Sequence, residues 1–224
     1  MAVFESCLVK NTKLGNTQNM KTSHPNKYIL TIKPKEYRTQ GLSHCGVYSI
    51  KAILNAYGLD NKTHPKYYHP NLLGRITGLT LGKNYNADIL RSYGIQAETK
   101  TAKHHSNLEK IQILKEILSR DTPVMLRIGN GYLSDKYNPV LGKIIGHWIT
   151  LWGYDDDKQI FYVYDSGLQK KYWKVNIPIG NTIRTYEEIL RDWNFGNIQF
   201  WVWPFSSADT FLYIQIENKK YIEP

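Results

Sequence analysis

The stretch Gln40-Gly41-Leu42-Ser43-His44-Cys45-Gly46-Val47 decides how the rest of the chain is interpreted. After it, apolar residues recur at helical spacing as far as Gly58, a residue type that commonly ends helices. These apolar positions are Val47, Ile50, Ile53, Leu54 and Tyr57. Cys45 is therefore expected at the amino terminus of a helix. Free backbone N–H groups and the positive end of the helix dipole favour a thiolate there, and the thiolate is the nucleophilic form of cysteine.

A candidate partner for Cys45 stands on a predicted hairpin further along the chain. The turn residues Asp155-Asp156-Asp157 separate two apolar runs, and a turn centred on Asp156 sets His147 opposite Asp165. Opposed side chains have Cβ atoms about 4.5 to 5.5 Å apart, so Asp165 can accept a hydrogen bond from the imidazole and fix its orientation. The same register pairs Ile149 with Val163 and Leu151 with Phe161.

The composition is that of a folded protein with a large core. The chain has 224 residues, of which 42% are hydrophobic, and its 17 Tyr and 6 Trp favour a sheet-rich interior. Its two cysteines, Cys7 and Cys45, do not suggest a disulfide framework and fit a reducing compartment.

Several classes of partner and location are disfavoured. No stretch approaches the roughly 18 apolar residues of a membrane span, and Met1 to Lys10 lacks the pattern of a secretory signal. We therefore expect a cytoplasmic protein, or one exported by a route without a recognisable signal peptide. The net charge is +10, but the 29 Lys and Arg residues are scattered, so we do not expect nucleic-acid binding.

The order of predicted elements favours an α+β fold with helices first and mainly antiparallel strands later. We expect a polar arm over residues 1–26 and one domain over residues 27–224. Helices are predicted over 45–57 and 87–93, and after the capping boxes that begin at Ser106 and Thr185. Strands are predicted over 28–33, 95–99, 123–128, 144–154, 160–165, 172–175, 198–203 and 211–216.

At Cys45 the sequence resembles the papain-like cysteine peptidases, and among them the bacteriocin-processing, double-glycine peptidases and their stand-alone relatives. The matching motifs keep that group's order over most of the chain: Gln40, Cys45-Gly46, Gly146-His147-Trp148, Gly153-Tyr154-Asp155, Asp165, and Tyr186-Glu187-Glu188 with Trp193. The resemblance implies a papain-like fold, with the nucleophile at a helix amino terminus packed on the sheet. It also implies that Cys45 is the nucleophile, His147 the general base and acid, and Asp165 the orienting residue. Gln40 and the backbone N–H of Cys45 would form the oxyanion hole.

Three positions depart from that group's pattern. Gln40 stands five residues before Cys45, where papain has six, and His44 occupies a place that often holds Asp. Ser166 follows Asp165 where the group commonly has Pro. The sequence holds no transporter part of the kind to which these peptidases are often fused, so a leader-peptide substrate is not implied.

Other motifs do not indicate a cofactor. His64, His69 and His104-His105 lack the Cys or carboxylate spacing of a zinc site, so we expect them to be loop and surface histidines. Asp155 to Asp157 lacks the spacing and closing Glu of a calcium loop. The run 78–84 is one residue short of a phosphate-binding loop and ends in Asn. We expect no metal and no cofactor.

The leading hypothesis from the sequence is a cysteine peptidase that cleaves peptide or isopeptide bonds in a peptide or protein substrate. An acyltransferase, deamidase or crosslinking enzyme with the same thioester chemistry is the first alternative. An inactive papain-like adaptor that only binds is the second. The oligomeric state stays open.

Overall fold

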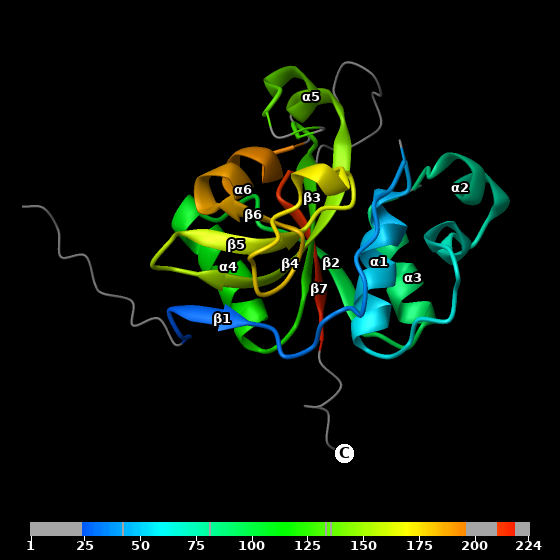
Figure 1. Cartoon of the computed structure of the whole chain (residues 1–224), viewed down its shortest axis with the longest axis horizontal. Helices are drawn as coiled ribbons and strands as arrows, with labels where there is room; N and C mark the ends of the chain where they lie inside the picture. Colours follow the sequence, from blue (N-terminus) through cyan, green and yellow to red (C-terminus); the bar gives the residue numbers. More distant parts are fainter. Residues whose placement is uncertain are drawn as a thin grey trace, which may run out of the picture.

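The structure is a computed structural model that describes residues 24–41, 43–80, 82–132, 134, 136–195 and 210–217. Its elements are β1 (Lys27–Ile29), α1 (Cys45–Ala56), the 3-10 helix η1 (Pro65–Tyr68), α2 (Leu72–Thr77), α3 (Tyr85–Ser92), β2 (Ala97–Thr101), α4 (Asn107–Ser119), β3 (Val124–Gly129), α5 (Pro139–Ile144), β4 (Gly146–Asp155), β5 (Ile160–Tyr164), the 3-10 helix η2 (Lys170–Tyr172), β6 (Thr182–Thr185), α6 (Tyr186–Trp193) and β7 (Leu212–Ile216). Figure 1 shows α1, α2 and α3 grouped beside the sheet. The α+β class is confirmed.

All strand pairs in the described part of the chain are antiparallel. The sheet order is β2-β7-β3-β4-β5-β6, and β1 pairs with the second half of β4. Every residue of β5 is buried, as is every residue of β4 after Gly146. This explains why both strands have nearly continuous apolar sequences instead of an alternating pattern.

Helix α1 packs on β4 with most of its length inside the protein. Its residues from Gly46 to Leu54 are all buried, and the apolar positions at helical spacing belong to the hydrophobic core or pack against it. The predicted helix from Cys45 is thus confirmed, and Figure 1 shows α1 beside the sheet. Because the helix is held along its length, the position of Cys45 relative to the sheet is fixed.

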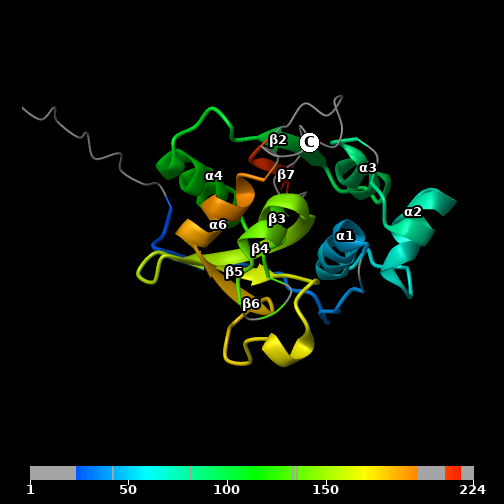
Figure 2. The same ribbon diagram turned by 90° about the horizontal axis from the view of Figure 1, so that it is seen from above.

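Two further helices, α4 and α6, contact one another and cover the sheet at a distance from α1 (Figure 2). Each begins with the capping box expected from the sequence. The Ser106 hydroxyl accepts from Glu109 N–H in α4, and the Thr185 hydroxyl accepts from Glu188 N–H in α6. In both helices the glutamate accepts in return from the backbone N–H of the capping residue.

The predicted register of the β4–β5 hairpin is wrong. Asp155 pairs with Ile160 across a four-residue turn, and Leu151 pairs with Val163, not with Phe161. A bulge at Trp152 lies between these two pairs, so β4 has one residue more than β5. Beside the bulge, Gly153 lies close to β1. A Cβ atom at this position would lie 2.5 Å from the carbonyl oxygen of Tyr28, so only glycine fits there.

The bulge decides which side chains share a face. The last pair of the ladder, Thr150 with Tyr164, puts Asp165 level with Ile149 instead of His147. This is a shift of two residues from the predicted register, and side chains alternate with a period of two. His147 and Asp165 therefore stay on one face as diagonal neighbours.

Some local predictions also differ from the structure. Residues 172–175 do not form a strand, because η2 and an open segment with an exposed Val175 occupy this place. The edge strand β6 was not predicted, nor were the short helices α2 and α5 in segments interpreted as loops. The predicted strand over 198–203 lies outside the described residues. No helix in the described ranges is long and apolar enough to cross a membrane.

Candidate active site

Cys45 is the first residue of α1, and its side chain is half-buried. The residue before it, His44, has a left-handed backbone with φ of 77° and provides no side-chain cap to the helix. In the absence of such a cap, the backbone donors of the first turn stay available to the sulfur. A backbone hydrogen bond from Gly46 N–H to the Cys45 sulfur is among the contacts that lower the pKa of the thiol.

His147 and Asp165 lie side by side and are both buried. A hydrogen bond of 2.8 Å joins His147 Nε2 to Asp165 Oδ1, and each residue is only 1% exposed. His147 comes from the start of β4 and Asp165 directly follows β5. The structure therefore brings these two predicted site residues together, through a diagonal contact instead of the direct opposition that we expected.

The Cys45 thiol contacts the same imidazole. Burial opposes ionisation of the thiol, but a hydrogen bond to His147 and the charge of its ring outweigh burial and hold the pKa of Cys45 below its ordinary value. Burial likewise opposes the imidazolium, yet Asp165 and Cys45 raise the pKa of His147 to about 10. Both directions favour a thiolate–imidazolium pair.

Asp165 has several partners besides His147. The backbone N–H of Gly167 donates to Oδ1 at 2.9 Å, and Arg184 Nη2 donates to Oδ2 at 3.2 Å. Burial opposes ionisation of this carboxyl, but these donors and His147 hold its pKa below the usual range. The side chain of Asn181 fixes the backbone of Asp165 through two bonds of 2.8 Å, one to its N–H and one to its carbonyl oxygen.

Gln40 lies on the segment before α1, next to the chain that follows β5. Its side-chain oxygen Oε1 accepts a hydrogen bond of 2.6 Å from Ser166 Oγ. Its backbone N–H donates to the carbonyl oxygen of Ser166 at 2.8 Å. The bond from Ser166 fixes the acceptor end of the Gln40 amide, and the NH2 group is the end that can donate to a ligand.

Of the histidines that we expected in loops and on the surface, His64, His104 and His105 are exposed, but His69 is not. His69 is completely buried rather than on the surface, since its Nδ1 contacts the Tyr85 hydroxyl at 2.9 Å and burial lowers its pKa to about 4. The ring of His44 lies 5.2 Å from that of His69, while His64 is exposed. Within the described ranges, no three or more His, Cys, Asp or Glu side chains come together as a metal site.

Sequence reasoning missed three residues that contact the site. Arg184 and Asn181 both contact Asp165, and both precede or lie on β6, the strand that was not predicted. Ser166 was noted only as a departure from a motif. The capping box at Thr185 could have drawn attention to Arg184, because a helix that starts there fixes the direction of the residue before it.

The chain matches one protein-family model and several solved structures. The model of the Peptidase C39 like family matches residues 23–194, a range that includes all the residues of the candidate site. The chain belongs to this family. Membership in a family of C39-like peptidases suggests cysteine peptidase activity.

A solved structure of another protein has a fold similar to that of this C39-like chain. The crystal structure of a C39-like peptidase candidate from Bacillus anthracis superposes with a TM-score of 0.52 at 12% sequence identity. The match covers 86% of this chain and 98% of that one. No curated protein sequence matches the chain.

Proposed function

We propose that this C39-like protein is a cysteine peptidase that hydrolyses peptide or isopeptide bonds through a thioester on Cys45. The observation that carries the proposal is the continuous series of contacts from Cys45 through His147 to Asp165 at the start of a buried helix. A thiol with a lowered pKa, next to an imidazole that a carboxylate orients, is the arrangement that activates a cysteine nucleophile.

In the first step, the Cys45 thiolate attacks the carbonyl carbon of the substrate and forms a tetrahedral oxyanion. The imidazolium of His147 then gives its proton to the leaving amine, so the C–N bond breaks as the thioester forms. Asp165 holds the ring through Nε2, which leaves Nδ1 to serve the sulfur and the amine. The carboxylate also stabilises the positive charge on the ring.

The oxyanion needs fixed donors where its charge develops. We assign this role to the backbone N–H of Cys45 and the NH2 group of Gln40, which Ser166 orients by binding the other end of the amide. One such donor lowers a barrier of this kind by roughly 3 to 4 kcal/mol. The departure from the family pattern at Ser166 thus has a function in this chain.

In the second step, neutral His147 takes a proton from water, and the hydroxide formed attacks the thioester carbonyl. The C–S bond breaks, the acid product leaves and the thiolate returns. An amine in place of that water would give acyl transfer, and a glutamine side chain as substrate would give deamidation. The contact between Cys45 and His147 argues against an inactive adaptor, since such a protein has no need of an activated thiol.

The proposal is tested by incubating the protein with an unbiased peptide library and recording the products by intact mass. Shortened products that disappear in the Cys45→Ala variant are expected. Products of increased mass would favour acyl transfer, and a shift of about one dalton would favour deamidation. Equal cleavage by wild type and Cys45→Ala would contradict the proposal.

A further inference from the structure

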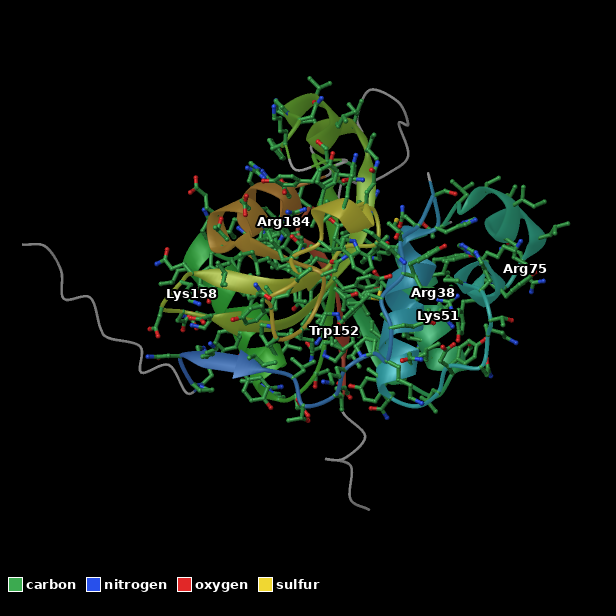
Figure 3. The ribbon with its side chains drawn as sticks, in the orientation of Figure 1. Arg38, Lys51, Arg75, Trp152, Lys158 and Arg184 are labelled. Carbon is green, nitrogen blue, oxygen red and sulfur yellow. The ribbon has the colours of Figure 1, made fainter. Side chains whose placement is uncertain are left out.

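Arg184 is a buried cation in direct contact with the site, and the two catalytic steps do not use it. It lies on the edge strand β6 and is 7% exposed (Figure 3). Its guanidinium donates to Asp165 Oδ2 at 3.2 Å, on the oxygen opposite the one that His147 binds. The guanidinium carbon also lies 3.8 Å from the centroid of the Tyr132 ring, which supports the cation from its face.

The charges in this buried set need balance. When Cys45 is a thiolate and His147 an imidazolium, the two cancel and the charge of Asp165 remains. A net charge in the interior is costly, so a carboxylate buried to this degree needs a cation that stays charged at every relevant pH. Guanidinium is the side-chain group that does so.

The other charged groups around Arg184 have partners of their own. On α6, Arg191 donates to both carboxylate oxygens of Asp192, at 2.8 and 3.1 Å. Glu188 accepts from the Tyr132 hydroxyl at 2.6 Å and sits in the first turn of α6, where the helix dipole favours an anion. Asp165 is therefore the carboxylate that the Arg184 guanidinium contacts directly. The residue before Asp165, Tyr164, donates its hydroxyl to the carbonyl oxygen of Arg38, and burial raises its pKa so that it stays neutral.

We propose that Arg184 is a positioning residue whose permanent charge keeps Cys45, His147 and Asp165 electrically balanced while all three are ionised. This inference rests on the proposed function, because it concerns the same site. Two effects follow. The guanidinium holds the Asp165 carboxylate toward His147, and it makes the thiolate easier and the imidazolium harder to form than Asp165 alone would.

The direction in which the two ionisation midpoints should move follows from the removal of one positive charge. In Arg184→Gln the amide can still donate to Asp165, but the charge is gone. The thiolate then loses stabilisation and the imidazolium gains it, so the midpoints of Cys45 ionisation and of His147 ionisation both move to higher pH. A measurable rise of both midpoints is expected, because the lost charge contacts the carboxylate that binds His147. A residue that only supports the fold would lower the thermal midpoint and leave both pH midpoints in place.

The experiment measures two midpoints without any substrate. The rate of Cys45 alkylation by iodoacetamide against pH, read by mass spectrometry on the peptide that contains Cys45, gives the thiol midpoint. NMR of 15N-histidine-labelled protein gives the His147 midpoint. Arg184→Lys keeps the charge and is expected to keep both midpoints. Arg191→Met is the matched control, because it removes a neighbouring arginine, stacked 3.6 Å over Tyr137, that pairs with Asp192 instead of Asp165.

A second pair of variants covers the case in which Arg184→Gln does not fold. Asp165→Asn removes the negative charge that pairs with Arg184, so both ionisation midpoints are expected to move to lower pH. Adding Arg184→Gln to it exchanges the ion pair for an amide pair and is expected to return both midpoints toward the wild-type values. Midpoints that do not respond to the loss of Arg184 in either background would overturn the inference. Alkylation of wild-type Cys45 at the rate of free cysteine would instead overturn the proposed function itself.

Discussion

Ser166 and Gln40 hold one another through two hydrogen bonds, from Ser166 Oγ to Gln40 Oε1 at 2.6 Å and from Gln40 N–H to the Ser166 carbonyl oxygen at 2.8 Å. Together they tie the segment before α1 to the chain that leaves β5. The same pair joins the residue next to Asp165 to the proposed oxyanion donor. A change at Ser166 is therefore expected to affect catalysis without touching the nucleophile or its base.

Ser166→Ala is predicted to lower kcat about fivefold, because one hydrogen bond that orients the Gln40 amide is worth about 1 kcal/mol. Gln40→Ala should cost more, roughly 150- to 900-fold, since it removes the donor itself. Both variants should keep the wild-type rate of Cys45 alkylation, which needs no oxyanion donor. Steady-state cleavage and alkylation measured on the same samples check this. A slower alkylation in either variant would show that the residue acts on the thiol instead.

Asp165→Asn is predicted to reduce kcat/KM by roughly 1,000-fold or more, because the amide cannot stabilise the imidazolium and can hold the wrong tautomer. Asn181→Ala is the milder comparison. It leaves the carboxylate in place and removes two bonds to the Asp165 backbone, so a loss of about tenfold is expected. Cleavage assays at several pH values measure both. Equal losses would mean that the Asp165 carboxylate contributes nothing beyond its backbone position.

Cleavage and alkylation are predicted to respond differently to alkaline pH. The rates of both reactions should rise at a pH below the pKa of free cysteine, because the pKa of Cys45 is lowered. Above about pH 10, where His147 loses its proton, cleavage should fall because no acid is left for the leaving amine, while the thiolate still alkylates. Parallel pH profiles of the two reactions test this. A joint decline would indicate unfolding, which circular dichroism at the same pH values would reveal.

A buried ion pair between α1 and the loop that follows it is predicted to stabilise the helical part. Lys51 Nζ contacts Asp60 Oδ2 and the Lys62 carbonyl oxygen, both at 2.6 Å. Lys51→Met leaves the largely buried Asp60 without its cation, although Tyr68 and Asn55 still donate to it, so a loss of about 3 kcal/mol in the free energy of unfolding is expected. Lys51→Met with Asp60→Leu should recover part of it. Urea titrations measure the difference, and an unchanged midpoint in Lys51→Met would contradict the assignment.

The ion pair of Lys51 and Asp60 should also make the stability of the fold decrease at acidic pH. Burial opposes ionisation of Asp60, but its bonds to Lys51 and Tyr68 hold the pKa of this carboxyl below its usual value. A depressed pKa in the folded state adds stability above the unfolded-state value of about 4, and this stability is lost as the pH falls through the folded-state pKa.

The long elements and the residues at their ends could be predicted from the sequence. Cys45 was placed at a helix start by apolar spacing, and the two capping boxes gave the starts of α4 and α6. The hairpin register could not be predicted, because it depends on the bulge at Trp152 and on the approach of Tyr28 to Gly153. These are contacts between segments far apart in the chain, and nothing in the local pattern of either strand records them.

The contacts of Arg184 and Asn181 with Asp165 could not be predicted from the sequence for a related reason. Arg184 and Asn181 reach the site because β6 pairs with β5, and a strand as short as β6 has no clear alternation. The burial of His69 was not expected from the sequence, because His69 follows η1 and its partner Tyr85 lies in α3. Residues brought in by edge strands and loops need the tertiary structure.

The most direct test of the central claim is the alkylation of Cys45 by iodoacetamide at pH 6 in wild type and in His147→Ala, read on the peptide that contains Cys45. Wild type should react at least tenfold faster than free cysteine, whose pKa of about 8.5 leaves little thiolate at this pH. His147→Ala should lose that advantage. A wild-type rate no faster than that of free cysteine, or an equal rate in the variant, would contradict a thiolate–imidazolium pair at this site.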